Sequence, residues 1–194
     1  MILLSRYSGQ EDIIVGSPIS DRNRVALEPL IGFFVNTLVL RTRLEGNPTF
    51  IKLLQQVRQM ALDAYAHQDV PFDQLVETLQ PQRHLSHSPL FQVMFVLQNS
   101  PSSKLELRDL QVTQIELQRA TAGATFDLTL SMQEKESASG TELIGAFEYN
   151  ANLFNADTIA RMMDSFHTLV EAVVADPQER IHYLYSQHPK SINY

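Results

Sequence analysis

Two pairs of polar residues stand where they could take part in chemistry. His67 and Asp69 lie near the expected end of a helix, where a histidine beside an acid could act as a general base. A histidine at a helix C-terminus also interacts favourably with the helix dipole, so a structural role is the favoured interpretation. Asn36 and Thr37 interrupt an apolar strand. Because burying such groups without partners costs about 2–7 kcal/mol, they either hydrogen-bond within the protein or line a cavity for water or substrate, and the pattern leaves both open.

Other catalytic and metal-binding patterns are weak or missing from the sequence. His84 and His87 could chelate a metal if they lay on one helical turn, but they fall in a proline-flanked loop without a nearby acid. A solvated loop is therefore the favoured interpretation, and no metal site is predicted. The sequence has no G-x-S-x-G, phosphate loop, dinucleotide fingerprint or H-E-x-x-H. Cysteine is absent, which excludes disulfides and thiolate catalysis.

The charge balance limits the partners. The 194 residues include 22 acids and 15 bases, for a net charge of −7. An acidic surface argues against nucleic acid as a partner, because phosphate contacts need basic residues. No apolar run approaches the roughly 20 residues of a membrane helix, and the first six residues are too short and mixed for a signal peptide. We therefore expect a cytoplasmic protein that binds neither nucleic acid nor a membrane.

The elements that must position these residues form an α+β pattern. Six apolar or alternating stretches are expected to be strands: residues 12–19, 31–41, 90–97, 110–117, 126–132 and 143–149. The second is apolar enough to be buried on both faces, and residues 134–140 are the expected turn between the last two. This order predicts helices packed on a mostly antiparallel or mixed sheet.

Three stretches have helical periodicity. Asn47 is the expected N-cap of the first helix, with Pro48 at its first position and the pattern breaking near His67. The second helix runs from Pro71 to Pro81. The third starts after Asn155 and ends at Asp176-Pro177, with an unbroken apolar stripe. Residues 177–194 have weak periodicity and are expected to be loosely held.

Three segments resemble the signature motifs of one enzyme family. Residues 31–41 read I-G-F-F-V-N-T-L-V-L-R and resemble the I-G-x-F-V-N-T-x-x-x-R motif of nonribosomal peptide synthetase condensation domains. Residues 67–73, H-Q-D-V-P-F-D, resemble the H-Q-D-x-P-F-[ED] motif. Residues 83–90, R-H-L-S-H-S-P-L, are similar to R-D-x-S-x-x-P-L, with His84 in place of the usual aspartate. One such motif is weak support, but three in the family's order are strong, and the likeness covers residues 1–176.

The resemblance implies a fold like that of chloramphenicol acetyltransferase. In this family two α/β subdomains form a V, with the active site in a tunnel between them. The reaction is amide formation, in which the amine of an acceptor aminoacyl thioester attacks the thioester carbonyl of a donor. Both substrates hang on 4′-phosphopantetheine arms of carrier domains, so no cofactor is expected to bind this chain directly. The implied partners are the N-terminal condensation subdomain, the donor and acceptor peptidyl carrier domains and a neighbouring adenylation domain.

The resemblance also gives the motif residues expected roles. Asn36 and Thr37 are expected to line the tunnel, with Asn36 facing the reaction centre, and Arg41 to form an ion pair or hydrogen bond. The other motif residues are expected to be structural: Gly32 and Phe34 in the first motif, His67, Gln68, Asp69, Pro71 and Phe72 at the join of two helices, and Arg83, Ser86 and Pro89 before the strand at Leu90.

The catalytic motif of the family, H-H-x-x-x-D-G, belongs to the first subdomain and does not occur in this sequence. None of the six histidines is adjacent to another, and no aspartate precedes a glycine. We therefore expect residues 1–176 to be the C-terminal subdomain, residues 177–194 to be a tail or the start of a linker, and the chain alone to be inactive. The alternative is a non-catalytic interaction module or gene remnant that retains the carrier or interdomain surface. An epimerisation or heterocyclisation relative fits less well, since those relatives differ at residues 34–37.

Overall fold

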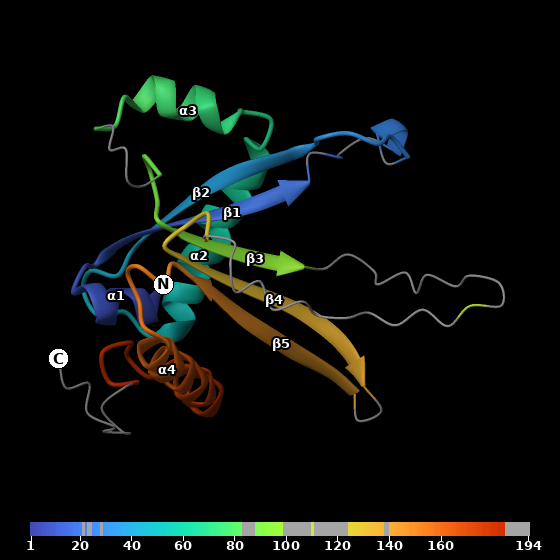
Figure 1. The fold of residues 1–194 in the computed structure, drawn as a ribbon. Helices are drawn as coiled ribbons and strands as arrows, with labels where there is room; N and C mark the ends of the chain where they lie inside the picture. The colour runs from blue at the N-terminus through green and yellow to red at the C-terminus, as the bar shows by residue number, and fades with distance from the viewer. Residues whose placement is uncertain are drawn as a thin grey trace.

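A mixed five-stranded sheet forms the centre of the molecule (Figure 1). The computed structural model describes residues 1–20, 22, 25–27, 29–82, 88–98, 110, 124–137 and 140–184. The strands are β1 (Asp12–Ser20), β2 (Val35–Arg43), β3 (Val93–Gln98), β4 (Leu128–Ser137) and β5 (Gly140–Tyr149), in the order β2-β1-β3-β4-β5. The pairs β1–β2 and β4–β5 are antiparallel, whereas β1–β3 and β3–β4 are parallel. The α+β prediction with a mixed sheet is confirmed.

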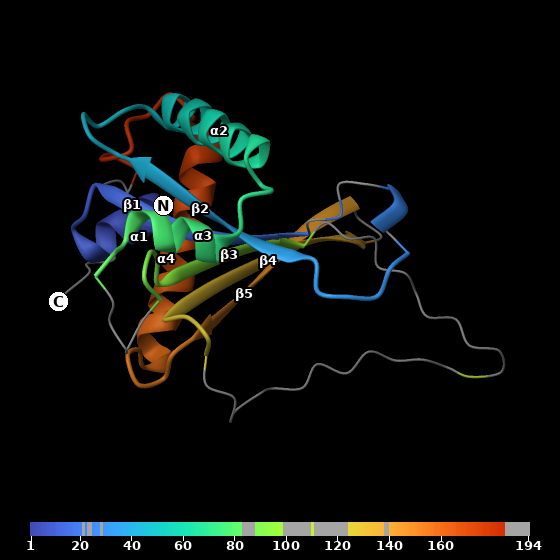
Figure 2. The same cartoon turned by 90° about the horizontal axis from the view of Figure 1, so that it is seen from above.

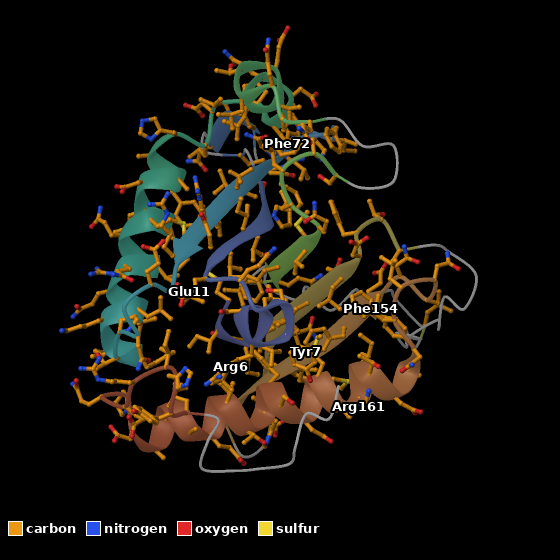
Figure 3. The ribbon with its side chains drawn as sticks, turned by 90° about the vertical axis from the view of Figure 1, so that its left-hand side faces the viewer. Arg6, Tyr7, Glu11, Phe72, Phe154 and Arg161 are labelled. Atoms are coloured by element: carbon orange, nitrogen blue, oxygen red, sulfur yellow. The ribbon has the colours of Figure 1, made fainter. Side chains whose placement is uncertain are left out.

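Helices cover one face of this sheet. The helices are α1 (Ile2–Ser8), α2 (Phe50–Ala66), α3 (Phe72–Leu79) and α4 (Ala156–Ala175), with a 3₁₀ turn, η1 (Val25–Leu27), after β1. Figure 3 shows α1 between α2 and α4 in front of the sheet, and Figures 1 and 2 place α3 beside β2. The core fills the space between the sheet and helices α1, α2 and α4, with Ile13 and Val15 from β1, Leu53 from α2 and Met162 from α4. Within the described ranges, no helix combines the length and apolar character needed to cross a membrane.

The predicted helix boundaries around α4 and α3 are confirmed. Asn155 caps α4, because its Oδ1 accepts a hydrogen bond of 2.8 Å from the Thr158 amide. Asp176 is the C-cap of the same helix. Pro71 is the N-cap of α3, and His67 is the C-cap of α2. At these helix ends the structure therefore has the boundaries that the capping residues predict.

The start of α2 differs from the prediction. Thr49, not Asn47, is the N-cap, and its side chain accepts a hydrogen bond from the Lys52 amide. Asn47 has a left-handed backbone with φ of 48°. Its Oδ1 accepts a hydrogen bond of 2.9 Å from the amide of His182, a residue 135 positions away. The predicted cap is wrong because a long-range contact uses the side chain that the local pattern assigned to the helix.

Strand β2 begins later than predicted and is not buried on both faces. It starts at Val35 and lies at the edge of the sheet, where β1 is its neighbour. Ile31 and Phe33, which the sequence pattern places inside the strand, lie before it and are 104% and 89% exposed. The prediction is wrong here because a continuous apolar run is compatible with a buried strand but does not by itself place both faces of that strand in the core.

The segment after α4 is packed rather than loose up to residue 184. Ile181 and Leu184 are buried in the core. Phe50 donates its amide to the Glu179 carbonyl at 3.0 Å, and Ile181 donates its amide to the Pro48 carbonyl at 3.0 Å. The expectation of a loosely held tail is therefore wrong for residues 177–184, because two apolar side chains and the α2 entry anchor it.

Two further expectations concern the second half of the sheet. The β4–β5 pairing runs from Leu128↔Tyr149 to Ser137↔Gly140, so the turn is shorter than the predicted residues 134–140. The predicted strand at 110–117 lies outside the described residues apart from Leu110. Helix α1 was not predicted, because seven residues are too few to display a helical period.

Candidate functional site

Asn36 joins strand β2 to the connection between α2 and α3. Its Nδ2 donates hydrogen bonds to the carbonyls of Gln68 at 2.7 Å and Val70 at 2.8 Å. Its Oδ1 accepts from the amides of Thr37 at 2.9 Å and Phe72 at 3.2 Å. A carboxamide has two donor and two acceptor positions, so backbone groups occupy all four. Of the two roles that the sequence left open, the structure shows the internal hydrogen bonding.

This geometry changes how Asn36 can serve a reaction. With every donor and acceptor position engaged, its carboxamide has none left for a substrate in this arrangement. The bonds instead fix the turn that carries residues 67–71 against the start of β2, where Asn36 itself is half-buried. Asn36 can therefore act on a neighbouring site by holding α3 in place. Thr37 is half-buried beside it and paired with Pro18 of β1.

His67 makes contacts that are typical of a helix C-terminus. The His67 ring is exposed and its Nδ1 donates a hydrogen bond of 2.9 Å to the Asp63 carbonyl, one turn back in α2. Its amide donates to the Ala64 carbonyl at 3.1 Å. Both bonds satisfy carbonyls at the helix end, which is the structural role favoured from sequence.

An aromatic cluster continues from the same connection toward the centre of the sheet. The Phe72 ring meets Phe91 edge-on with centroids 5.7 Å apart, and Phe91 lies 5.4 Å from Phe126. Figure 3 shows Phe72 between α3 and the strands. Phe91 is almost fully buried and lies directly over Gly16 of β1, where a Cβ would come within 2.3 Å of its ring. Only glycine leaves room for this contact.

Arg41 forms the ion pair that was expected of it. Its Nε and Nη2 donate hydrogen bonds to the carboxylate of Asp12 across the β1–β2 pair, and Nη2 lies 2.6 Å from Oδ2. Hydrogen bonding from Arg41 lowers the pKa of Asp12, and the same bond raises the pKa of Arg41. Both side chains are substantially exposed, so the pair fixes strand register more than it contributes stability.

The remaining motif residues fall partly outside the described chain. Gly32 lies against the ring of Phe34, and the Arg22 guanidinium stacks 4.4 Å above that ring. Pro89 is half-buried two residues before Phe91. Arg83, Ser86 and the two histidines of the proposed loop, His84 and His87, lie outside the described residues. Within the part that is described, no three side chains of metal-binding type come together.

Three residues of this site, Gly16, Phe91 and Phe126, are not predicted from the sequence. Gly16 stands inside an apolar strand, a position that often marks a close approach of another group, and that signal could have been used. Phe91 and Phe126 each precede a strand and resemble ordinary core residues. Their meeting depends on the parallel order of β1, β3 and β4, which local patterns do not give.

Sequence comparisons point to large peptide synthetases. The chain is 52% identical over 180 residues to a linear gramicidin synthase of Brevibacillus parabrevis, covering 93% of this chain and 3% of that protein. It is 46% identical over 178 residues to a plipastatin synthase of Bacillus subtilis, covering 92% of this chain and 5% of that protein. The chain therefore spans a small part of these relatives.

Comparison with solved structures points to the same class of proteins. The X-domain from teicoplanin biosynthesis is 30% identical with a TM-score of 0.78, over 93% of this chain and 41% of that one. A four-domain nonribosomal peptide synthetase bound to AMP and glycine matches the fold with a TM-score of 0.80 at 23% identity, over 93% of this chain and 14% of that one. The family model named Condensation domain matches residues 1–190. The family model and these relatives show that the chain belongs to the condensation domain family.

Proposed function

We propose that this chain is the C-terminal wall of an amide-forming condensation site. The observation that carries the proposal is the meeting of the first two signature segments beside Phe91, the residue that follows the third. Asn36 of the first segment hydrogen-bonds to the backbone of the second, and Phe72 of the second packs on Phe91, next to the end of the third. A region built only for stability does not require that two signatures separated in the sequence meet in this way.

In this proposal the wall contributes position rather than proton transfer. A thioester is already activated, so holding the acceptor amine beside the donor carbonyl removes much of the entropic barrier. Asn36 and Thr37 are proposed to shape the tunnel wall by fixing α3 against β2, with Asn36 as a positioning residue. The histidine that handles the proton is proposed to belong to the N-terminal condensation subdomain, which closes the tunnel and limits hydrolysis.

The proposed partners follow from the same arrangement. Donor and acceptor peptidyl carrier domains deliver the substrates on 4′-phosphopantetheine arms, and an adenylation domain neighbours the site. The similarity to gramicidin and plipastatin synthases supports this setting. The subdomain itself is proposed to include residues 1–184, because Ile181 and Leu184 belong to its core.

Reconstitution tests the proposal. The chain is combined with a matching N-terminal condensation half through a short linker that raises the effective concentration. Loaded donor and acceptor carriers are added, and the tethered products are identified by mass spectrometry. We expect amide product from the joined halves, and none from either half alone. The control is the joined protein in which the second histidine of the partner's H-H-x-x-x-D-G is replaced.

Two results would contradict the proposal. Amide formation by residues 1–194 alone at the rate of the joined protein would show that the chain is a complete catalyst. A joined protein that folds cooperatively and binds both carriers, yet forms no product, would show that this wall does not serve condensation.

An interaction module is the second candidate. The observation in its favour is that the X-domain from teicoplanin biosynthesis, 30% identical to this chain, was solved in a complex with OxyB. If this chain serves in the same way, it binds a partner enzyme without forming amides. Carrier titration separates the two, since a module of this kind binds its partner with the same affinity whether or not the carriers are loaded.

A further inference from the structure

The outer edge of β2 carries backbone groups that β1 does not use. Among the described strands, β2 pairs with β1 alone. The Leu44 amide donates to the Glu11 carbonyl at 2.8 Å, in continuation of the β1–β2 register. Because ladder hydrogen bonds alternate along an antiparallel pair, even-numbered residues of β2 turn their backbone groups toward β1 and odd-numbered residues turn theirs outward. The Thr37 amide agrees with this, since it donates to Asn36 Oδ1 at 2.9 Å and not to β1.

Three outward residues beyond Thr37 leave this edge open: Val39, Arg41 and Arg43. Across the described ranges of the chain, their amides and carbonyls take part in no hydrogen bond outside the β1–β2 pair. Unpaired amides and carbonyls along an edge strand form a template for another extended segment. The template is short, because the Asn36 carboxamide already occupies the edge at Thr37.

A pocket of about 240 Å³ lies between this edge and α2. It is lined by Arg41, Thr42 and Arg43 from β2 and by Gln56 and Met60 from α2, and Figure 3 shows α2 beside β2. Thr42 is only 5% exposed, and its Oγ1 has no hydrogen-bond partner among the residues that the structure describes. A buried hydroxyl without a partner is unfavourable. An occupant that brings a polar backbone group into this pocket would remove that cost.

The side chains at this edge carry a surplus of positive charge. Side chains alternate between the two faces of a strand, so Arg41 and Arg43 project from the face opposite to Thr42. Arg41 holds both oxygens of Asp12, whereas Arg43 Nε lies 3.7 Å from the same carboxylate. In the described part of the chain no other acid forms an ion pair with either arginine. Two guanidinium groups, each more than half exposed, therefore share one carboxylate, and a second carboxylate would complement them.

We propose that the edge of β2 from Val39 to Arg43 binds an extended acidic peptide segment of a partner protein as an added strand. The backbone of the segment pairs with the outward amides and carbonyls, and its carboxylates lie on the face of Arg41 and Arg43. The residue between two such acids turns a small apolar side chain toward the half-buried Met60 of α2. A second copy of β2 fits less well, because a two-fold pairing centred on Arg41 sets this residue against its own copy. The inference rests on this edge and not on the condensation function.

Peptide titration tests the proposal. The probe is an end-blocked peptide of alternating glutamate and valine, titrated into residues 1–194. One control peptide has lysine in place of glutamate, and another carries N-methyl groups on its peptide nitrogens, so that it cannot pair as a strand. The protein variants are Arg43→Glu and Thr42→Val. Arg58→Glu is the matched control, because it makes the same charge change at an exposed position of α2 outside the pocket. Dissociation constants and hydrogen exchange of the β2 amides are measured.

Strand addition predicts a specific pattern. The glutamate peptide binds and slows exchange of the amides of Val39, Arg41 and Arg43 by about threefold or more. Arg43→Glu weakens binding by about threefold or more, and Arg58→Glu changes it by less than about twofold. Thr42→Val folds as stably as the wild type and binds less tightly, so it decides the matter if Arg43→Glu does not fold.

Several results would overturn the proposal. They are no binding at about 1 mM glutamate peptide, equal binding of the lysine or N-methylated peptide, and protection confined to amides outside the β2 edge. A dimer whose β2 amides are protected without peptide would also overturn it, because a second copy then occupies the edge.

Discussion

Replacement of Asn36 by alanine tests whether the carboxamide holds the α2–α3 connection. The substitution removes four hydrogen bonds, to Gln68, Val70, Thr37 and Phe72. At about 0.5–1.5 kcal/mol for each bond, the largest loss is about 2–6 kcal/mol. Asn36 is half-buried, so water replaces part of this. We expect the free energy of unfolding to fall by about 2–3 kcal/mol.

Asn36→Asp separates the hydrogen bonds from side-chain volume. The aspartate can still accept from the amides of Thr37 and Phe72, but its second oxygen faces the carbonyls of Gln68 and Val70. Only the protonated acid can donate there, so folding raises the pKa of the introduced acid above about 3.9. A raised pKa stabilises the fold below the unfolded value and loses that stabilisation as the pH rises through the folded value. The deficit relative to wild type is therefore smaller near pH 4 than near pH 7.

Urea denaturation of the wild type and both variants measures these changes. Gln59→Ala is the matched control, because it removes an exposed amide whose Nε2 donates to Asp63 Oδ1 at 2.9 Å within α2. We expect the control to change the free energy of unfolding by less than about 0.5 kcal/mol. If Asn36→Ala is as neutral as the control, the carboxamide does not hold the connection and the argument for a positioning role fails.

Three further predictions concern other parts of the molecule. Arg41→Ala removes the hydrogen bond that lowers the pKa of Asp12. The wild type loses stability as the pH falls through that pKa, and we expect the variant to lose less. Denaturation at a series of acidic pH values measures the difference, and an equal loss of stability in both proteins would contradict the prediction. Gly16→Ala brings a Cβ within 2.3 Å of the Phe91 ring and lowers stability by about 1–3 kcal/mol; adding Phe91→Leu should cost less than the sum of the single changes, and strict additivity would refute the contact. Acetylation of Met1 removes a buried amine whose pKa falls from 8.0 to about 6 on folding. The free energy of unfolding of the unmodified chain therefore rises by about 2–3 kcal/mol between about pH 6 and pH 8, and that of the acetylated chain does not. Urea denaturation at both pH values measures the rise, and an equal rise in both chains would show that other groups cause it.

The sequence could predict those features that depend on neighbouring residues. Asn155 signalled the start of α4 because a cap and its amide partners lie within three positions. Alternation located β4 and β5, and Arg41 was expected to form an ion pair or a hydrogen bond. The same local logic failed at Asn47, whose side chain is held by His182 across the fold.

The role of Asn36 shows where sequence reasoning ends. Its hydrogen-bond partners outside its own strand lie more than 30 residues away and are backbone groups, which any residue type supplies. The sequence could therefore show that this amide needs partners but not which ones. In the same way, Gly16 was visible as an unusual strand residue, but the ring of Phe91 above it depended on the pairing of β1 with β3.

The parallel pairing of β1 with β3 has a consequence for synthesis on the ribosome. Gly16 is registered with Met94, so about 80 residues must be made before β1 meets its inner neighbour. At roughly 5–20 residues per second this takes about 4–16 s. During that interval the hairpin of β1 and β2 can form, but the inner edge of β1 is open to pairing with another nascent chain. Adjacent ribosomes on one message would then carry open edges side by side, so translation speed between the codons for residues 16 and 94 is expected to affect the yield of folded protein.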